Sequence, residues 1–143
     1  SIAPLNARML AASRATYDHY GYTPNFTTLA GYFTELEKRG TAVNVGTFVG
    51  AGGVRSLVIG EDNRAPTPPE LEAMKKAVAQ AMEEGALGLS TSLIYVPDQF
   101  ASTDEIMALK RSDACKSFNA SYMMAFPTGP ATLPAGTLKG VGS

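Results

Sequence analysis

One stretch of the sequence narrows the possible folds more than any other, because a complete helix signal runs directly into a short apolar strand. Thr67-Pro68-Pro69-Glu70 fits a capping box with proline at the first helical position. Apolar side chains then recur at helical spacing until Gly85, and residues 86–91 follow as a compact apolar run. Helix, glycine and buried strand together form one unit of a parallel α/β protein. In such folds chemistry collects at the carboxyl ends of the strands.

Further units of the same kind flank this stretch. Residues 26–39 have the spacing of an amphipathic helix, and residues 43–49 alternate β-branched and other side chains as a strand does. Residues 102–109 begin with a second capping-box pattern and predict another helix. Residues 121–126 are a candidate third buried strand. The order of these elements predicts an α/β fold of parallel strands with flanking helices.

The number of predicted strands is small for such a fold. The chain has 143 residues, of which 45% are apolar and 17% charged, as in globular proteins. Two or three parallel strands would leave long unpaired edges. We therefore expect the chain to be a segment of a larger fold, with possible self-association through open sheet edges.

Net charge, apolar runs and cysteine content bear on the partners and the compartment of the chain. A formal net charge of −1 gives no electrostatic attraction to nucleic acid or to an anionic membrane. No apolar run reaches the roughly 18 residues that a spanning helix needs. A single cysteine, Cys115, forms no internal disulfide and predicts a reducing, cytoplasmic compartment. We therefore expect no nucleic acid partner and no membrane partner.

A glycine-rich turn at residues 50–55 suggests a second, weaker interpretation. Gly50, Ala51 and Gly52 match the first half of a dinucleotide-binding fingerprint, but Arg55 stands where the third glycine belongs. We also expect no clean helix to open at Val54 that could receive a pyrophosphate. Nucleotide binding is therefore the less favoured hypothesis for this turn.

The single histidine, His19, lies in an aromatic segment with Tyr17, Tyr20 and Tyr22, which we expect to be a loop. A metal site needs three or four converging ligands, which one histidine does not supply. A nucleophilic serine also needs a base, so a Ser-His pair is not expected. We predict that His19 is a surface or hydrogen-bonded loop residue.

Five segments of the sequence match the pattern of a known enzyme family. They are residues 44–50, 54–55, 64–68, 82–97 and 100–105. Through them the chain resembles the D-aminoacylase (N-acyl-D-amino-acid deacylase) group of the amidohydrolase superfamily. The resemblance implies part of a (β/α)8 TIM barrel, here incomplete. It also implies a hydrolase in which zinc activates water to cleave N-acyl-D-amino acids and an aspartate shuttles protons.

The resemblance stops near Leu109, and the family's metal ligands have no counterpart here. Tyr122 stands where the family would have a histidine ligand, and Cys115-Lys116-Ser117 replaces an expected glycine pair. We therefore expect residues 1–109 to be an amidohydrolase-like partial barrel segment. Residues 110–143 are expected to be a divergent, partly disordered tail. The family uses zinc, but we predict no metal ligand, no bound metal and no identifiable catalytic residue in this chain.

The resemblance leaves three candidate substrate-binding residues, Tyr95, Arg55 and Ser92. Tyr95 would donate a hydrogen bond in the pocket, and Arg55 would hold a substrate carboxylate. Each has a structural alternative, since Tyr95 would also suit the rim of a barrel and Arg55 would also pair with an acid such as Glu61 or Asp62. Ser92 lies at the exit of the strand at residues 86–91.

Two functional hypotheses follow. The first is a fragment of a metal-dependent amide hydrolase, inactive as an isolated chain, whose family acts on small N-acyl amino acids. The alternative is a non-catalytic α/β fragment or subunit that acts through protein–protein contacts.

Overall fold

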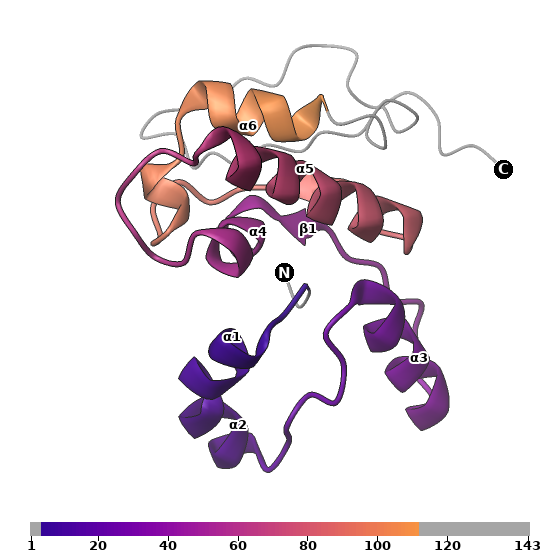
Figure 1. Ribbon diagram of the computed structural model, residues 1–143. Helices are drawn as coiled ribbons and strands as arrows, with labels where there is room; N and C mark the ends of the chain where they lie inside the picture. Colours follow the sequence, from indigo (N-terminus) through magenta and orange to yellow (C-terminus); the bar gives the residue numbers. More distant parts are fainter. Residues whose placement is uncertain (1–3, 112–143) are drawn as a thin grey trace, which may run out of the picture.

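The fold was analysed in a computed structural model, which describes residues 4–111 (Figure 1). The two strands, β1 and β2, form a parallel pair in which Val49 lies opposite Leu89 and Gly50 opposite Ser90. Between residues 4 and 111 no helix is long and apolar enough to cross a membrane. The elements, in chain order, are α1 (Ala7–Ala12), α2 (Arg14–Tyr20), α3 (Leu29–Arg39), β1 (Val49–Gly50), α4 (Ala51–Val58), α5 (Pro68–Glu83), β2 (Leu89–Ser90), the 3-10 turn η1 (Asp98–Phe100) and α6 (Thr103–Lys110). The predicted α/β class is thus confirmed.

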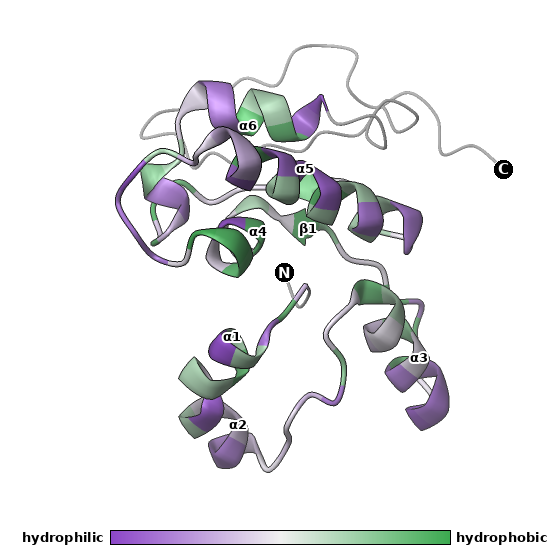
Figure 2. Ribbon diagram, viewed as in Figure 1, coloured by the Kyte–Doolittle hydropathy of each residue, from purple (hydrophilic) through white to green (hydrophobic). Residues whose placement is uncertain are grey.

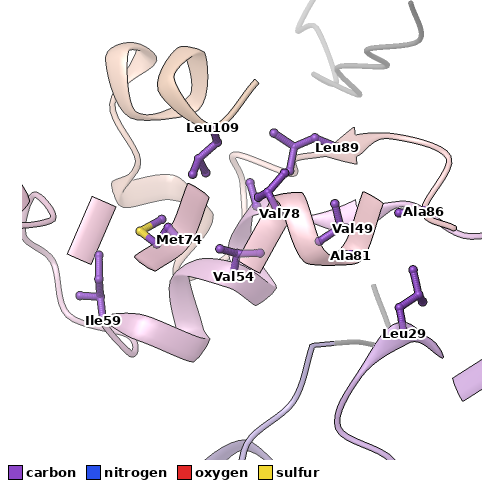
Figure 3. Packing of buried hydrophobic residues seen from close by; sticks show 11 residues of the cluster. Leu29, Val49, Val54, Ile59, Met74, Val78, Ala81, Ala86, Leu89 and Leu109 are labelled. Atoms are coloured by element: carbon purple, nitrogen blue, oxygen red, sulfur yellow. The ribbon is translucent and has the colours of Figure 1, made fainter. Parts of the chain in front are cut away.

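The core lies where α4, α5 and α6 pack together beside the strand pair (Figures 1 and 3). Met74 and Val78 of α5 are completely buried, as is Val54 of α4. Figure 2 shows the hydrophilic residues of α5 along one side of the helix and its hydrophobic residues along the other. The remaining buried members of the cluster are Leu29, Val49, Ala51, Ile59, Ala81, Ala86, Leu89 and Leu109.

Helix α5 begins and ends where the sequence predicts. Glu70 accepts a hydrogen bond from the backbone N–H of Thr67 at 2.8 Å, as a capping box requires, and Pro68 is the first helical residue. Gly85 follows the helix with a φ of 103°, a left-handed conformation that favours glycine. The backbone N–H of Ala86 then bonds to the carbonyl of Ala81 at 2.9 Å, which turns the chain toward β2.

Both strands are shorter than predicted. Residues 43–48 lie outside β1, and the side chains of Val43 and Val45 are 69% and 41% exposed. Backbone pairing is first seen at Thr47, whose carbonyl accepts from the N–H of Leu87 at 2.8 Å. A β-branched pattern forms a strand only where a neighbouring strand supplies hydrogen bonds. In the described part of the chain no strand lies beside residues 43–46.

The expectation that no helix opens after the glycine-rich turn is wrong. Helix α4 starts at Ala51, immediately after β1, with Gly50 at the N-cap. Burial of Ala51 and Val54 against the core offsets the poor helix propensity of the two glycines between them. The helix ends before Gly60, whose φ of 91° stops it as the sequence indicated.

The segment expected to be an aromatic loop is partly helical, since Tyr17 and Tyr20 lie in a helix and Tyr22 follows it. Residues 14–20 form α2, which ends at Gly21 with a φ of 62°. The candidate strand at residues 121–126 and most of the predicted tail fall outside the described residues. The division between residues 109 and 110 stays a prediction.

Candidate functional site

The candidate site is the edge of the sheet where β1 and β2 end side by side. Because the strands are parallel, Gly50 and Ser90 bring the start of α4 and the loop at residues 91–97 to the same edge. Ligand sites of parallel α/β proteins lie at such edges. The three predicted substrate-binding residues all follow these two strands, but the structure gives them very different surroundings.

Arg55 is fully buried on α4 and forms an ion pair with Glu105 of α6. Its Nη1 donates to both carboxylate oxygens of Glu105 at 2.7 Å, and its Nη2 donates to the backbone carbonyls of Asp62 and Arg64. The alternative that Arg55 pairs with an acid is thus confirmed, but the acid is Glu105 and not Glu61 or Asp62. The role of Arg55 in substrate binding stays a prediction, and it would require Glu105 to release the guanidinium.

Glu105 was visible in the sequence only as part of a capping box. Ser102 does cap α6, with its Oγ accepting from the N–H of Glu105 at 3.1 Å. The Glu105 side chain, however, bonds to Arg55 and is 3% exposed. A carboxylate is rarely buried without a partner, so the ion pair with Arg55 explains its position.

Ser92 lies at the exit of β2, held through its backbone rather than its hydroxyl. Its N–H donates to Oδ2 of Asp98 at 2.8 Å, and its carbonyl accepts from the N–H of Tyr95 at 3.1 Å. The carbonyl of Tyr95 in turn accepts from the N–H of Gln99 at 2.9 Å. These bonds shape the loop from Ser92 to Asp98 into a compact turn.

Asp98 is the site residue that sequence reasoning missed. Its side chain lies against the first turn of α4, since a Cβ built on Gly52 would be 2.9 Å from Cγ of Asp98. The position suits a carboxylate, because the N-terminal end of a helix attracts negative charge and α4 has no acidic residue in its own first turn. The sequence did contain a glycine at position 52 and an acidic residue directly after Pro97. These two positions lie far apart in the sequence, and no local pattern links them.

Two buried oxygens at this edge remain unpaired. Asp98 is 7% exposed and Thr91 is 6% exposed, yet Oδ1 of the first and Oγ1 of the second have no hydrogen-bond partner among residues 4–111. Buried polar atoms are usually satisfied. These two oxygens are exceptions, and both are shielded from solvent at this edge.

Tyr95 is exposed to solvent and does not pack into the core. Its side chain is 65% exposed, in a run with Leu93, Ile94 and Val96, which are also exposed. The phenol is thus available as a hydrogen-bond donor, and the rest of the loop presents an apolar surface. Its assignment to a substrate pocket stays a prediction.

The described residues do not form a metal centre. Between residues 4 and 111 no group of three His, Cys, Asp or Glu side chains could hold a metal ion. His19 is an exposed residue of α2 whose ring meets that of Tyr20 edge-on at 5.0 Å. It is therefore a surface histidine, on a helix rather than in a loop. Tyr122, which the resemblance places where the family has a histidine ligand, lies outside the described residues, and its assignment stays a prediction.

The edge is also unsuited to a dinucleotide. Helix α4 does open after β1, but the carboxylate of Asp98 already lies at its N-terminal turn. A pyrophosphate would meet like charge there. Arg55, in place of the third fingerprint glycine, is buried in the ion pair with Glu105.

Comparison with known proteins bears on the family resemblance. No protein-family model matches the chain. An N-acyl-D-glutamate deacylase from Alcaligenes xylosoxydans xylosoxydans is 34% identical over 96 residues, which are 67% of this chain and 20% of the relative. The D-aminoacylase of the same organism is 34% identical over 78% of this chain and 23% of its own length. Its N-acyl-D-aspartate deacylase is 37% identical over 57% of this chain and 16% of its own length.

A solved structure agrees with these relatives. The N-acyl-D-glutamate deacylase from Bordetella bronchiseptica, complexed with zinc and a phosphonate inhibitor that mimics the tetrahedral intermediate, matches with a TM-score of 0.62 at 34% identity. The match covers 80% of this chain and 23% of that structure. The chain thus spans about a fifth of the length of the proteins it matches. The resemblance to the D-aminoacylase group of amidohydrolases is confirmed in sequence and in fold over that fifth.

Proposed function

We propose that this chain is a segment of a metal-dependent N-acyl-D-amino-acid deacylase, with the fold of a partial (β/α)8 barrel, and that it supplies one wall of the substrate pocket. The observation that carries the proposal is the shared edge at Gly50 and Ser90, where an anchored loop presents Tyr95. The similarity to deacylases over the same residues supports it.

The residues of this chain would bind and orient substrate. The Tyr95 phenol would donate a hydrogen bond to an oxygen of an N-acyl amino acid, and the exposed apolar residues beside it would contact the acyl group. Asp98 would act as a positioning residue, because it fixes the N–H of Ser92 and hence the loop. In the family a bound zinc supplies activated water. The described residues do not fit a zinc site, so no step through zinc is assigned to them.

A chimeric enzyme tests directly whether this chain forms one wall of the substrate pocket. The segment of the Bordetella bronchiseptica deacylase that matches this chain would be replaced by the corresponding residues of this chain, and hydrolysis of N-acetyl-D-glutamate would be measured. We expect turnover, and we expect Tyr95→Phe in the chimera to raise KM or lower kcat by about tenfold, as loss of one hydrogen bond to a polar substrate group does. The exposed neighbour Gln99→Ala serves as control. Unchanged kinetics in Tyr95→Phe would remove Tyr95 from the pocket.

The isolated chain is expected to be inactive, because the described residues lack a metal site. Zinc content after purification and release of the carboxylic acid from N-acetyl-D-glutamate would be measured together. We expect zinc well below one equivalent and no turnover. Turnover that survives repurification and disappears with a chelator would contradict this expectation.

A second function, association through the open sheet, is favoured by the distribution of exposed apolar residues. In the described part of the chain every large exposed hydrophobic residue except Tyr20 lies in a segment that precedes or follows one of the two strands in the sequence. These residues are Val43, Val45, Leu87, Leu93, Ile94, Tyr95 and Val96. Exposed apolar residues gathered in this way mark interaction surfaces, and unpaired strand edges add free hydrogen-bonding groups.

Sedimentation of the isolated chain tests this second function. We expect the mean mass to rise with concentration and the rise to be suppressed by a Val43→Lys, Ile94→Lys double variant. Tyr20→Lys, which alters an equally exposed residue away from the strands, should leave the rise unchanged. A chain that stays monomeric at all concentrations would exclude self-association through these edges.

A further inference from the structure

A hollow of about 570 Å³ lies between the α1–α2 hairpin and α3, and the proposed function does not use it. In Figure 1 these three helices form the lower part of the described fold, with the loop at residues 21–28 between them. Neither α1 nor α2 contains a buried residue. Their inward side chains, among them Met9 and Tyr17, line open space instead of packing against α3.

The hollow has aromatic walls. Tyr17, Tyr22 and Tyr32 all line it. The ring of Tyr32 is held between those of Phe26 and Phe33, with centroid distances of 5.4 and 5.6 Å. Both contacts are tilted, with interplanar angles of 56° and 43°, and they restrict the Tyr32 ring on α3. A cavity of this size with mostly apolar walls and a few polar groups is typical of a small-molecule site, for which the usual range is about 300–1,000 Å³.

The two charged groups that line the hollow, Glu35 and Arg39, differ in how far their hydrogen-bonding atoms are already used. Nε of Arg39 donates to Oε1 of Glu35 at 2.6 Å, and Nδ2 of Asn25 donates to Oε2 at 3.1 Å. Both oxygens of Glu35 therefore already accept a bond. Among residues 4–111, the terminal nitrogens of Arg39 have no hydrogen-bond partner, and the guanidinium lies 4.7 Å from the centroid of the Tyr22 ring.

This arrangement favours an anion over a cation. The Arg39 guanidinium is oriented by Glu35 on one side and by the Tyr22 ring on the other, and its two terminal nitrogens form a fork that matches a carboxylate. The charge of Glu35 is already balanced by Arg39, so a ligand ammonium would compete with the guanidinium for the carboxylate. Its bond to Arg39, and then its bond to Asn25, lower the pKa of Glu35, so the carboxylate stays ionised and keeps the guanidinium in place.

We propose that the hollow between the α1–α2 hairpin and α3 binds a small carboxylic acid with a flat apolar body. The ring of the ligand lies against Tyr32 and Tyr17, and its carboxylate accepts hydrogen bonds from Arg39. The site is separate from the edge at Gly50 and Ser90, so it does not depend on the deacylase proposal.

Three probes that share one ring test the proposal on the full chain. They are 2-naphthoate, 2-naphthylmethanol and 2-naphthylmethylammonium, which differ in charge but hardly in shape. Binding is followed by NMR of 13C-methyl methionine, in which Met9 reports on the hollow and Met74 on the buried core. We expect 2-naphthoate to bind most tightly and to shift the Met9 signal while the Met74 signal stays in place. No shift of Met9 at millimolar probe, or equal or tighter binding of the ammonium compound, would overturn the proposal.

A pair of arginine variants locates the carboxylate. Arg39→Gln should weaken 2-naphthoate by about three- to tenfold and leave the binding of 2-naphthylmethanol unchanged, since only the charged group loses a partner. Retained binding of the alcohol also shows that the hollow is intact in the variant. Arg14→Gln, on α2 and paired among the described residues with the exposed Asp18, is the control and should not change either affinity. Equal affinity of wild type and Arg39→Gln for 2-naphthoate would refute the assignment.

Discussion

Nη1 of Arg55 lies 2.7 Å from both carboxylate oxygens of Glu105, and the two side chains are 1% and 3% exposed. This ion pair joins α4 to α6. The two paired residues lie 50 positions apart in the sequence. Helix α4 begins where β1 ends, at the shared edge of the two strands. The pair therefore connects the wall of the candidate site to the core.

Removal of one partner should be costly, because the other charge would remain buried without compensation. We expect Glu105→Ala to lower the free energy of unfolding by about 3–5 kcal/mol, measured by urea denaturation. The double variant Arg55→Met, Glu105→Leu should recover most of that loss, since two apolar side chains fill the same space. Glu72→Ala, which breaks an exposed pair with Lys75, is the control and should cost at most about 1 kcal/mol. Equal effects of Glu105→Ala and Glu72→Ala would contradict the structural role given to the buried pair.

Asp98 should control the mobility of the loop that carries Tyr95. In Asp98→Ala the N–H of Ser92 loses its charged acceptor, and we expect its hydrogen exchange to reflect a local opening easier by about 1.5–3 kcal/mol. Exchange at Met74 and Val78, in the centre of α5, should change much less. Gln99→Ala, an exposed change in the same loop region, should leave the Ser92 rate as it is in the wild type. A Ser92 amide that exchanges equally fast in all three proteins would show that Asp98 does not anchor the loop.

Gly52 should resist a substitution that usually stabilises helices. Alanine is favoured over glycine in a helix by about 1 kcal/mol, but its Cβ here would lie 2.9 Å from Cγ and 3.0 Å from both oxygens of Asp98. We therefore expect Gly52→Ala to destabilise the protein in thermal unfolding. In an Asp98→Ala background the same change should become neutral or stabilising, a sign reversal that a double-mutant cycle detects. Additive effects would mean that the two residues are not in contact.

Stability should depend on pH through Glu70 at the start of α5. Arg64, and then the backbone and side chain of Thr67, lower the pKa of Glu70 through hydrogen bonds to its carboxylate. A carboxyl whose pKa is lower in the folded than in the unfolded chain stabilises the fold above its unfolded pKa, and this contribution is lost as the pH falls. Glu70→Gln should thus be less stable than wild type at pH 7, with a difference that shrinks as the pH falls below the usual glutamate range. A difference that is constant from pH 7 to the acid limit would contradict this linkage.

The local elements were largely predictable. The capping box at Thr67 and the glycine at position 85 mark the bounds of α5 to within a residue or two, and the N-cap Ser102 marks the start of α6. Caps and left-handed glycines act over only a few neighbouring residues, so the sequence shows them. The deacylase resemblance was equally visible, since it rests on contiguous motifs. The start of α4 was not, because its two glycines argue locally against a helix and only burial against the core offsets them.

The sequence by itself determined where the main helices begin and end, the parallel α/β class and the family resemblance. Only the tertiary structure decided how long the strands are, which carboxylate receives Arg55, and that Asp98 anchors the loop of Tyr95. The physical reason is the distance along the chain over which each interaction acts. A cap or a periodic apolar face is stabilised within a few turns of chain, whereas a strand needs a neighbour and a buried charge needs a partner. Here that partner lies 50 residues away and is brought close only when α4 and α6 pack against the same core.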